Sequence, residues 1–163
     1  MGAVTVERVS GGLGVTKGSA YHHFSSRNDL VEAALARWEE RATQAIIVEL
    51  SRIEAPRARL RAILAVTVGQ NRGPIGEYLV ISSTDALAAP FIQRVTAARL
   101  QFLETIYVDF GLSRTQAALW ALDCYSGYLG VLTLRETRPD EKMLDRLGDR
   151  YFDHLLTRLT PPR

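Results

Sequence analysis

The chain has 163 residues, 47% of them hydrophobic, and a formal net charge of +2. This length allows one domain-sized core with a small appended module, and the near-balanced charge does not by itself indicate a nucleic-acid partner. One cysteine excludes a disulfide framework, and Met1–Ser10 lacks the apolar run of a signal peptide, so we expect a cytoplasmic protein.

The first predicted elements are two short helices joined by a turn. Thr5 can cap a helix that runs to about Gly11, where a glycine pair ends it because glycine disfavours helix interiors. After a turn at residues 13–15, Thr16 can cap a second helix over residues 17–24. This arrangement is typical of a helix-turn-helix, whose second helix can lie in the major groove of DNA.

Helical spacing divides the second helix into an inner and an outer face. Ala20 and Phe24 are apolar and four residues apart, so we expect them to face the protein. The pairs expected to face outward, also four apart, are Lys17 with Tyr21 and Gly18 with His22. A cation, a bare backbone site, a phenol and an imidazole suit phosphates or base edges.

The adjacent histidines of this helix allow other interpretations. Neighbouring helical residues point about 100° apart, and no cysteine or carboxylate stands at matching spacing, so we expect no metal site. Catalysis would need a positioned partner and a pocket, which a short exposed helix does not provide. An exposed helical hairpin without a DNA partner remains an alternative on the residues alone.

Longer helices follow in the first half of the chain. Ser26–Asp29 has the capping-box pattern and introduces a long helix. Its apolar positions are Leu30, Ala34 and Trp38, continued by Ile46, Leu50 and Ile53. Pro56 interrupts it, a helix over residues 57–70 follows, and residues 71–76 form a loop or kink.

The second half predicts three further helices. Pro90 starts one whose stripe is Phe91, Val95, Ala98, Phe102 and Ile106, and Gly111 stops it. The capping box Ser113–Gln116 opens a helix to about Arg135 that is apolar nearly all round, with Trp120, Cys124, Tyr128 and Val131 on one face. A last helix begins near Pro139 and carries Met143, Leu147, Tyr151, Leu155 and Leu159 along one edge. Strand patterns are poor, so we expect an all-α protein, and the polar residues of the longest apolar run argue against a membrane span.

The stretch from Thr5 to Leu30, TVERVSGGLGVTKGSAYHHFSSRNDL, resembles the DNA-binding signature of the TetR family of bacterial transcriptional regulators. The matching positions are Gly14, Val15, Gly18, Tyr21, His23, Phe24 and Leu30. The resemblance implies that Thr16, Tyr21, His22 and His23 contact phosphates, that Lys17 and Gly18 approach base edges, and that Ser19 lies at the groove. Arg27 stands where the family usually has a phosphate-binding lysine. The positive charge is therefore kept, but a planar guanidinium replaces the ammonium group.

The chain departs from the family pattern in its first helices. Gly11, Gly12 and Leu13 replace residues that are usually helix formers or small, so we expect a less stable helix there. The family also places another helix before the position of Thr5, the first of the usual three. No such helix precedes Thr5 here, which leaves three alternatives open: a start codon assigned too late, a truncated product, or impaired DNA binding.

The resemblance implies a two-part organisation, with a DNA-binding region over residues 1–45 and a ligand-binding and dimerisation domain over residues 46–163. The homodimer would use the last two helices, where Gly127 and Gly130 permit close approach. The candidate ligand-binding residues are Tyr78, Phe102, Trp120, Asp123 and Cys124, although core packing is the alternative for each. Asp123 is the possible polar anchor, because a carboxylate inside an apolar helix needs a partner.

Together these features predict a ligand-responsive repressor. It would bind a palindromic double-stranded DNA operator and be released by a small apolar or aromatic effector. The alternative is a dimeric small-molecule-binding protein that has lost DNA binding through N-terminal truncation. We expect no enzymatic activity, cofactor or metal, because no nucleophile–base spacing, phosphate loop or metal cluster appears.

Overall fold

The computed structural model describes residues 10–12, 14, 16–68, 85–137 and 143–162. Helices and their connections account for all of these residues, which confirms the all-α prediction. The predicted cap at Thr5, the loop over 71–76, Tyr78 and the helix start near Pro139 lie outside them. So do the side chains of Lys17, Ala20 and Tyr21, whose backbone is helical.

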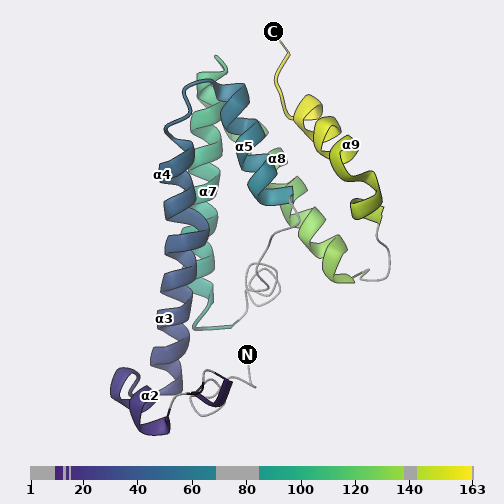
Figure 1. Cartoon of the computed structure of the whole chain (residues 1–163). Helices are drawn as coiled ribbons and strands as arrows, with labels where there is room; N and C mark the ends of the chain where they lie inside the picture. The colour runs from purple at the N-terminus through teal and green to yellow at the C-terminus, as the bar shows by residue number, and fades with distance from the viewer. Residues whose placement is uncertain (1–9, 13, 15, 69–84, 138–142, 163) are drawn as a thin grey trace.

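The first helices form a long rod with a short helix at its end. The rod consists of α3 (Arg27–Glu39), the π-helix η1 (Glu40–Gln44) and α4 (Ala45–Leu50), preceded by α2 (Lys17–His23). The remaining helices are α5 (Pro56–Val68), α7 (Ala89–Asp109), α8 (Arg114–Thr137) and α9 (Met143–Arg158). Figure 1 shows α7 alongside the rod and α2 at the end of the rod away from α5.

Local sequence signals set most helix starts as predicted. The Ser19 amide donates to Thr16 Oγ1 over 3.2 Å, and the Asp29 amide donates to Ser26 Oγ over 3.1 Å. At α8 the Gln116 amide donates to Ser113 Oγ over 3.4 Å, while Gln116 Oε1 accepts from the Ser113 amide over 3.1 Å. This last pair is the reciprocal capping box that the sequence predicts.

The stop of α7 at Gly111 is confirmed. Gly111 has a φ of 92°, the left-handed conformation that only glycine adopts readily. Its amide donates to the Val108 carbonyl over 2.8 Å, and the Leu112 amide donates to the Tyr107 carbonyl over 3.3 Å. These two bonds form a Schellman motif, which turns the chain from α7 toward α8.

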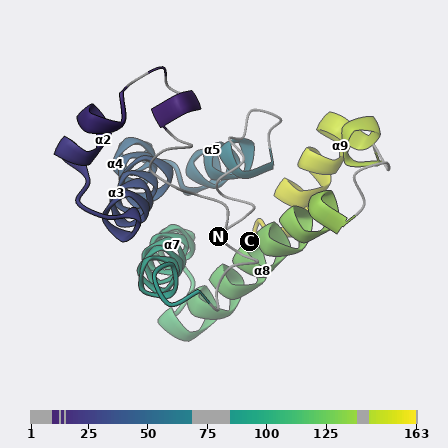
Figure 2. The same ribbon diagram turned by 90° about the horizontal axis from the view of Figure 1, so that it is seen from below.

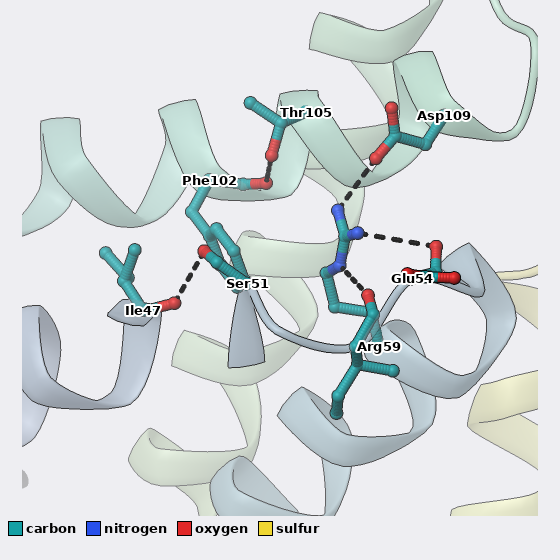
Figure 3. Close-up of polar contacts among 8 residues, drawn as sticks. Ile47, Ser51, Glu54, Arg59, Phe102, Thr105 and Asp109 are labelled. Atoms are coloured by element: carbon teal, nitrogen blue, oxygen red, sulfur yellow. Dashed lines mark hydrogen bonds and ion pairs between the residues drawn. The ribbon is translucent and has the colours of Figure 1, made fainter. Parts of the chain in front are cut away.

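The long helix predicted after Ser26 differs from the structure in two places. Residues 40–44 form a π-helix, in which the Ala45 amide donates to the Glu40 carbonyl five residues earlier. The rod then ends at Leu50, and Ser51 Oγ donates to the Ile47 carbonyl over 2.7 Å (Figure 3). Pro56 does not simply interrupt a helix, because it is the first residue of α5, where its missing amide is not needed.

The main core lies where α5, α7, α8 and α9 meet. Its fully buried members include Leu60, Ile106, Tyr107, Ala117 and Ala121. The Tyr107 hydroxyl donates to the Leu159 carbonyl over 3.0 Å, which fastens the end of α9 to α7. A smaller cluster of Val31, Leu35 and Ala88 joins α3 to the start of α7.

Arg59 fixes the connection between α4 and α5, a role that the sequence analysis did not predict. Its guanidinium donates to Asp109 Oδ2 over 2.7 Å, to the Ile53 carbonyl over 2.8 Å and to the Glu54 carbonyl over 3.4 Å. Figure 3 shows the side chain reaching from α5 to the end of α7. The Arg59 side chain is 11% exposed, so these acceptors replace the water it loses.

The helix α8 is the one described helix that is long and apolar enough to cross a membrane, over Arg114–Leu134. It packs along α7, with Ala117 and Ala121 fully buried. Its other face leaves Leu119 60% exposed and Leu122 52% exposed. One chain therefore does not cover this nearly all-apolar helix on every side.

Candidate functional sites: an exposed N-terminal helix and an inner cavity

The turn before α2 depends on glycine. Gly14 has a φ of 66°, and its amide donates to the Gly11 carbonyl over 3.3 Å. Other L-residues rarely adopt this left-handed conformation, so the glycine allows the chain to reverse between two helical segments. Thr16 then caps α2, which confirms the predicted helix–turn–helix order over the described residues.

The outer surface of α2 is open. Gly18, Ser19, His22 and His23 are exposed, and a Cβ atom at Gly18 would meet nothing within 4 Å. Phe24 is half-buried, in agreement with its predicted inner position. The backbone of α2 at Gly18 can therefore come into direct contact with a partner surface.

The predicted contact residues have different local roles in the fold. The Thr16 hydroxyl is the cap of α2, so its oxygen already accepts the Ser19 amide. Arg27 is the first residue of α3 and is half-buried, directly after the Ser26 cap. Residues 16–28 contain the cations Lys17 and Arg27 and no carboxylate. This charge distribution favours an anionic partner.

The two histidines do not form a recognisable metal centre. The rings of His22 and His23 meet edge to face, with centroids 5.5 Å apart. Across the described part of the chain, no three His, Cys, Asp or Glu side chains group as metal ligands would. The pair is therefore better described as part of the exposed end of α2.

A cavity of about 1290 Å³ lies between the rod and the other helices of the bundle. Residues of α3, η1, α4, α5, α7, α8 and α9 line it. Four of the five predicted ligand-binding residues are in its wall, namely Phe102, Trp120, Asp123 and Cys124. The predicted face of α8 is also confirmed, because Trp120, Cys124, Tyr128 and Val131 all line this cavity.

Cys124 is an apolar wall residue rather than a nucleophile. It is buried, and burial raises the pKa of its thiol to about 11, against a smaller lowering by the Tyr107 hydroxyl. Burial likewise raises the pKa of Tyr107. Both groups are therefore neutral at physiological pH.

Asp123 differs from its prediction. The sequence suggests a carboxylate enclosed in an apolar helix, which would need a partner, yet the residue is exposed. Its position in the cavity wall beside Trp120 and Cys124 is nevertheless as expected. Because solvent reaches it, no buried ion pair is required at this position.

The polar part of the cavity wall, above all Arg99 of α7, was not predicted from the sequence. Arg99 Nε donates to Thr43 Oγ1 over 3.0 Å and Nη2 donates to the Ala42 carbonyl over 3.0 Å, both in η1. A signal was present, since Arg99 lies four residues after Val95 and three before Phe102, both on the predicted apolar stripe. A cation at that spacing indicates a polar group on an inward face.

Comparison with known protein families gives a match at the N-terminus of the chain. Residues 1–34 match the family model described as bacterial regulatory proteins of the tetR family, a range that includes the Gly14 turn, α2 and the first turns of α3. No curated protein matches the chain, and no solved structure matches it. The family match confirms the resemblance seen in residues 5–30.

Proposed function

Because this chain belongs through its N-terminal region to the tetR family of bacterial regulatory proteins, we propose that it is a ligand-responsive transcriptional repressor of the bacterial cytoplasm. The match over α2 carries the proposal, since it identifies a DNA-binding regulator. The open face of α2 and the large cavity beside the middle of the rod support a protein with one DNA site and one effector site.

In the proposed complex, α2 enters the major groove. Lys17 and Gly18 approach base edges, and Ser19 lies at the groove. The phosphate contacts come from Thr16, Tyr21, His22, His23 and Arg27. Exposed Gly18 supports this arrangement because no side chain holds the helix backbone away from the DNA.

The repressor would act as a homodimer through α8 and α9. Leu119 and Leu122 are more than half exposed on α8. An added Cβ atom at Gly130 would meet nothing within 4 Å in one chain, so this position leaves room for a neighbouring helix, whereas Gly127 lines the cavity. A two-fold dimer would place its α2 helices about 34 Å apart, in successive major grooves of a palindromic operator.

The effector would be a small apolar or aromatic molecule that enters the cavity. Phe102, Trp120 and Cys124 would supply apolar contacts, with Asp123 at the edge. Binding would change the spacing of the two α2 helices and release the DNA. The response can be only as large as the effector's preference for the released state.

A gel shift with the DNA upstream of the protein's own gene tests the DNA assignment. We expect Lys17→Ala and Tyr21→Ala each to weaken binding about tenfold or more, because the first removes a base-edge contact and the second a phosphate contact. Arg52→Ala is the matched control, because Arg52 is exposed in the turn at the opposite end of the rod. Unchanged affinity in both α2 variants would contradict the groove assignment.

A further inference from the structure

We propose that the cavity binds a hydrophobic carboxylic acid and that Arg99 holds its carboxylate. The inference rests on the proposed ligand-responsive function and adds the chemical class of the effector and the residue that recognises it. It follows from the hydrogen bonds of Arg99, from the charges in the cavity wall and from the apolar remainder of that wall.

Arg99 is held in place by neutral oxygens. Besides its bonds to Thr43 and Ala42, its Nη1 donates to the Tyr128 hydroxyl over 3.4 Å. A guanidinium group has five N–H donors, so one N–H on each terminal nitrogen has no acceptor among the described residues. Arg94, five residues earlier on α7, has the partner that Arg99 lacks, because it forms a two-bond ion pair with Glu39.

The surroundings of Arg99 fix the orientation of its guanidinium. The Trp38 ring centroid is 5.7 Å from Arg99 Cζ, and the Tyr128 ring centroid is 5.8 Å from it. The bonds to η1 restrain the same group from a third direction. A restrained guanidinium pays little further conformational entropy when it binds an anion, which favours a planar, two-oxygen acceptor such as a carboxylate.

The charge of the wall also favours an anion. Arg37, Arg41 and Arg158 line the cavity with Arg99, and Asp123 is the one carboxylate among the described lining residues. None of these four arginines forms an ion pair with another described residue, since the two ion pairs there belong to Arg59 and Arg94. Because Arg37, Arg41 and Arg158 are exposed, water screens their charges, and the half-buried Arg99 is the cation that an acid in the cavity meets most directly.

The rest of the wall requires a hydrophobic ligand body. The apolar lining near Arg99 and across from it includes Ile46, Phe102, Leu103, Trp120, Val131 and Leu132. A small polar anion would leave this surface without contacts, whereas a fully apolar ligand would leave the guanidinium donors without an acceptor. An aromatic or aliphatic acid satisfies both parts of the wall.

Isothermal titration calorimetry on the full chain tests the inference without DNA. The probes are 2-naphthylacetate and decanoate, compared with the neutral 2-naphthylacetamide and decan-1-ol and with the cationic 2-(2-naphthyl)ethylamine. We expect at least one acid to bind roughly 10- to 100-fold more tightly than its neutral counterpart. No binding of either acid, or equal binding of acid and neutral counterpart, would overturn the inference.

Variants then test the role of Arg99. Arg99→Met should remove the preference for the acid, and Arg99→Lys should reduce it, because lysine keeps the charge without the paired donors. Arg94→Met is the control on the same helix, outside the cavity wall, and should leave acid binding unchanged. An acid preference that survives in both Arg99 variants would overturn the assignment. Tighter binding of the amine than of the acids, if Asp123→Asn abolishes it, would also overturn the assignment.

The DNA response is measured separately. A protein that binds the acid through Arg99 but keeps its operator bound would support this inference and contradict the proposed effector response. A protein that releases DNA with the neutral or cationic probe instead of the acids would keep the proposed response and overturn the ligand class.

Discussion

At the scale of single residues, two arginines join helices through backbone carbonyls. Arg59 binds the carbonyls of Ile53 and Glu54 and the carboxylate of Asp109, while Arg99 binds the Ala42 carbonyl. A guanidinium has enough donors to serve several acceptors at once. Each arginine therefore restrains a non-α-helical segment, the α4–α5 connection or η1, against α7.

The first prediction concerns Arg59. Arg59→Met should lower the free energy of unfolding by roughly 1–3 kcal/mol, because it removes three hydrogen bonds that join the α4–α5 connection to α5 and α7. Asp109→Asn should have a smaller effect, since the Asp109 side chain is 47% exposed and its charge is screened by water. Urea unfolding followed by circular dichroism measures both, with Arg57→Met on the exposed face of α5 as the control. An Arg59 variant as stable as the control would contradict this role.

The second prediction concerns the pH dependence of Cys124. Its pKa of about 11, compared with the ordinary 9.0, makes the thiolate about 100-fold scarcer at pH 8. Alkylation by iodoacetamide should therefore be at least that much slower in the folded protein than in urea, and its rate should rise with pH up to about 11. The thiol has the lower pKa in the unfolded chain, so the unfolded chain loses the proton at a lower pH than the folded protein does. The free energy of unfolding therefore falls as the pH rises from 9 to 11. Equal rates in folded and unfolded protein at pH 8 would show that the thiol is accessible and normal.

At the scale of helices and turns, local chemistry could be predicted and long-range packing could not. The caps at Thr16, Ser26 and Ser113 and the stop at Gly111 each depend on a few adjacent residues, so the sequence was sufficient. The π-helix could not be predicted in this way. It is stabilised by Arg99, a residue more than fifty positions away along the chain.

The third prediction concerns the turn at Gly111. Gly111→Ala should destabilise the protein by about 1–2 kcal/mol, because alanine is strained at a φ of 92°. The space around this glycine is open, so a steric clash does not contribute. Gly111→Asn provides the matched comparison, since asparagine tolerates the left-handed conformation better and should lose less. Thermal unfolding measures both variants, and equal losses would show that the backbone conformation is not the cause.

At the scale of the whole molecule, the two candidate sites lie at different places along the rod. Figure 1 shows α2 at one end, and Figure 2, viewed from below, shows α8 and α9 on the side away from α2. Spacing along α8 was enough to predict that Trp120 and Cys124 share one face of that helix, and spacing along α7 was enough to place Phe102 on its apolar stripe. Arg37, Trp38 and Arg41 could not be assigned to the same cavity, because only the tertiary packing of the rod brings them there.

The fourth prediction concerns the proposed dimer. Wild-type protein should sediment as a dimer at micromolar concentration, and the double variant Leu119→Glu/Leu122→Glu should be a folded monomer, because charges would replace the exposed leucines of α8. Val48→Glu is the matched control, since Val48 is 58% exposed on α4. Analytical ultracentrifugation with circular dichroism measures mass and folding together. A monomeric wild type, or a dimer that persists in the double variant, would contradict the proposed interface.

The π-helix has a consequence for the rotation of the rod about its own axis. Val31 and Leu50 are both buried, and they are 19 residues apart. In a regular α-helix, 19 residues rotate the side-chain direction by five full turns plus about 100°. The π-helix Glu40–Gln44 accommodates one extra residue in its turn and so offsets the additional 100° of rotation. Val31 and Leu50 therefore lie on the same side of the rod. Rewinding those five residues as regular α-helix would twist α2 by about 100° relative to the bundle. The angle at which α2 is presented is thus set by the segment that Arg99 holds.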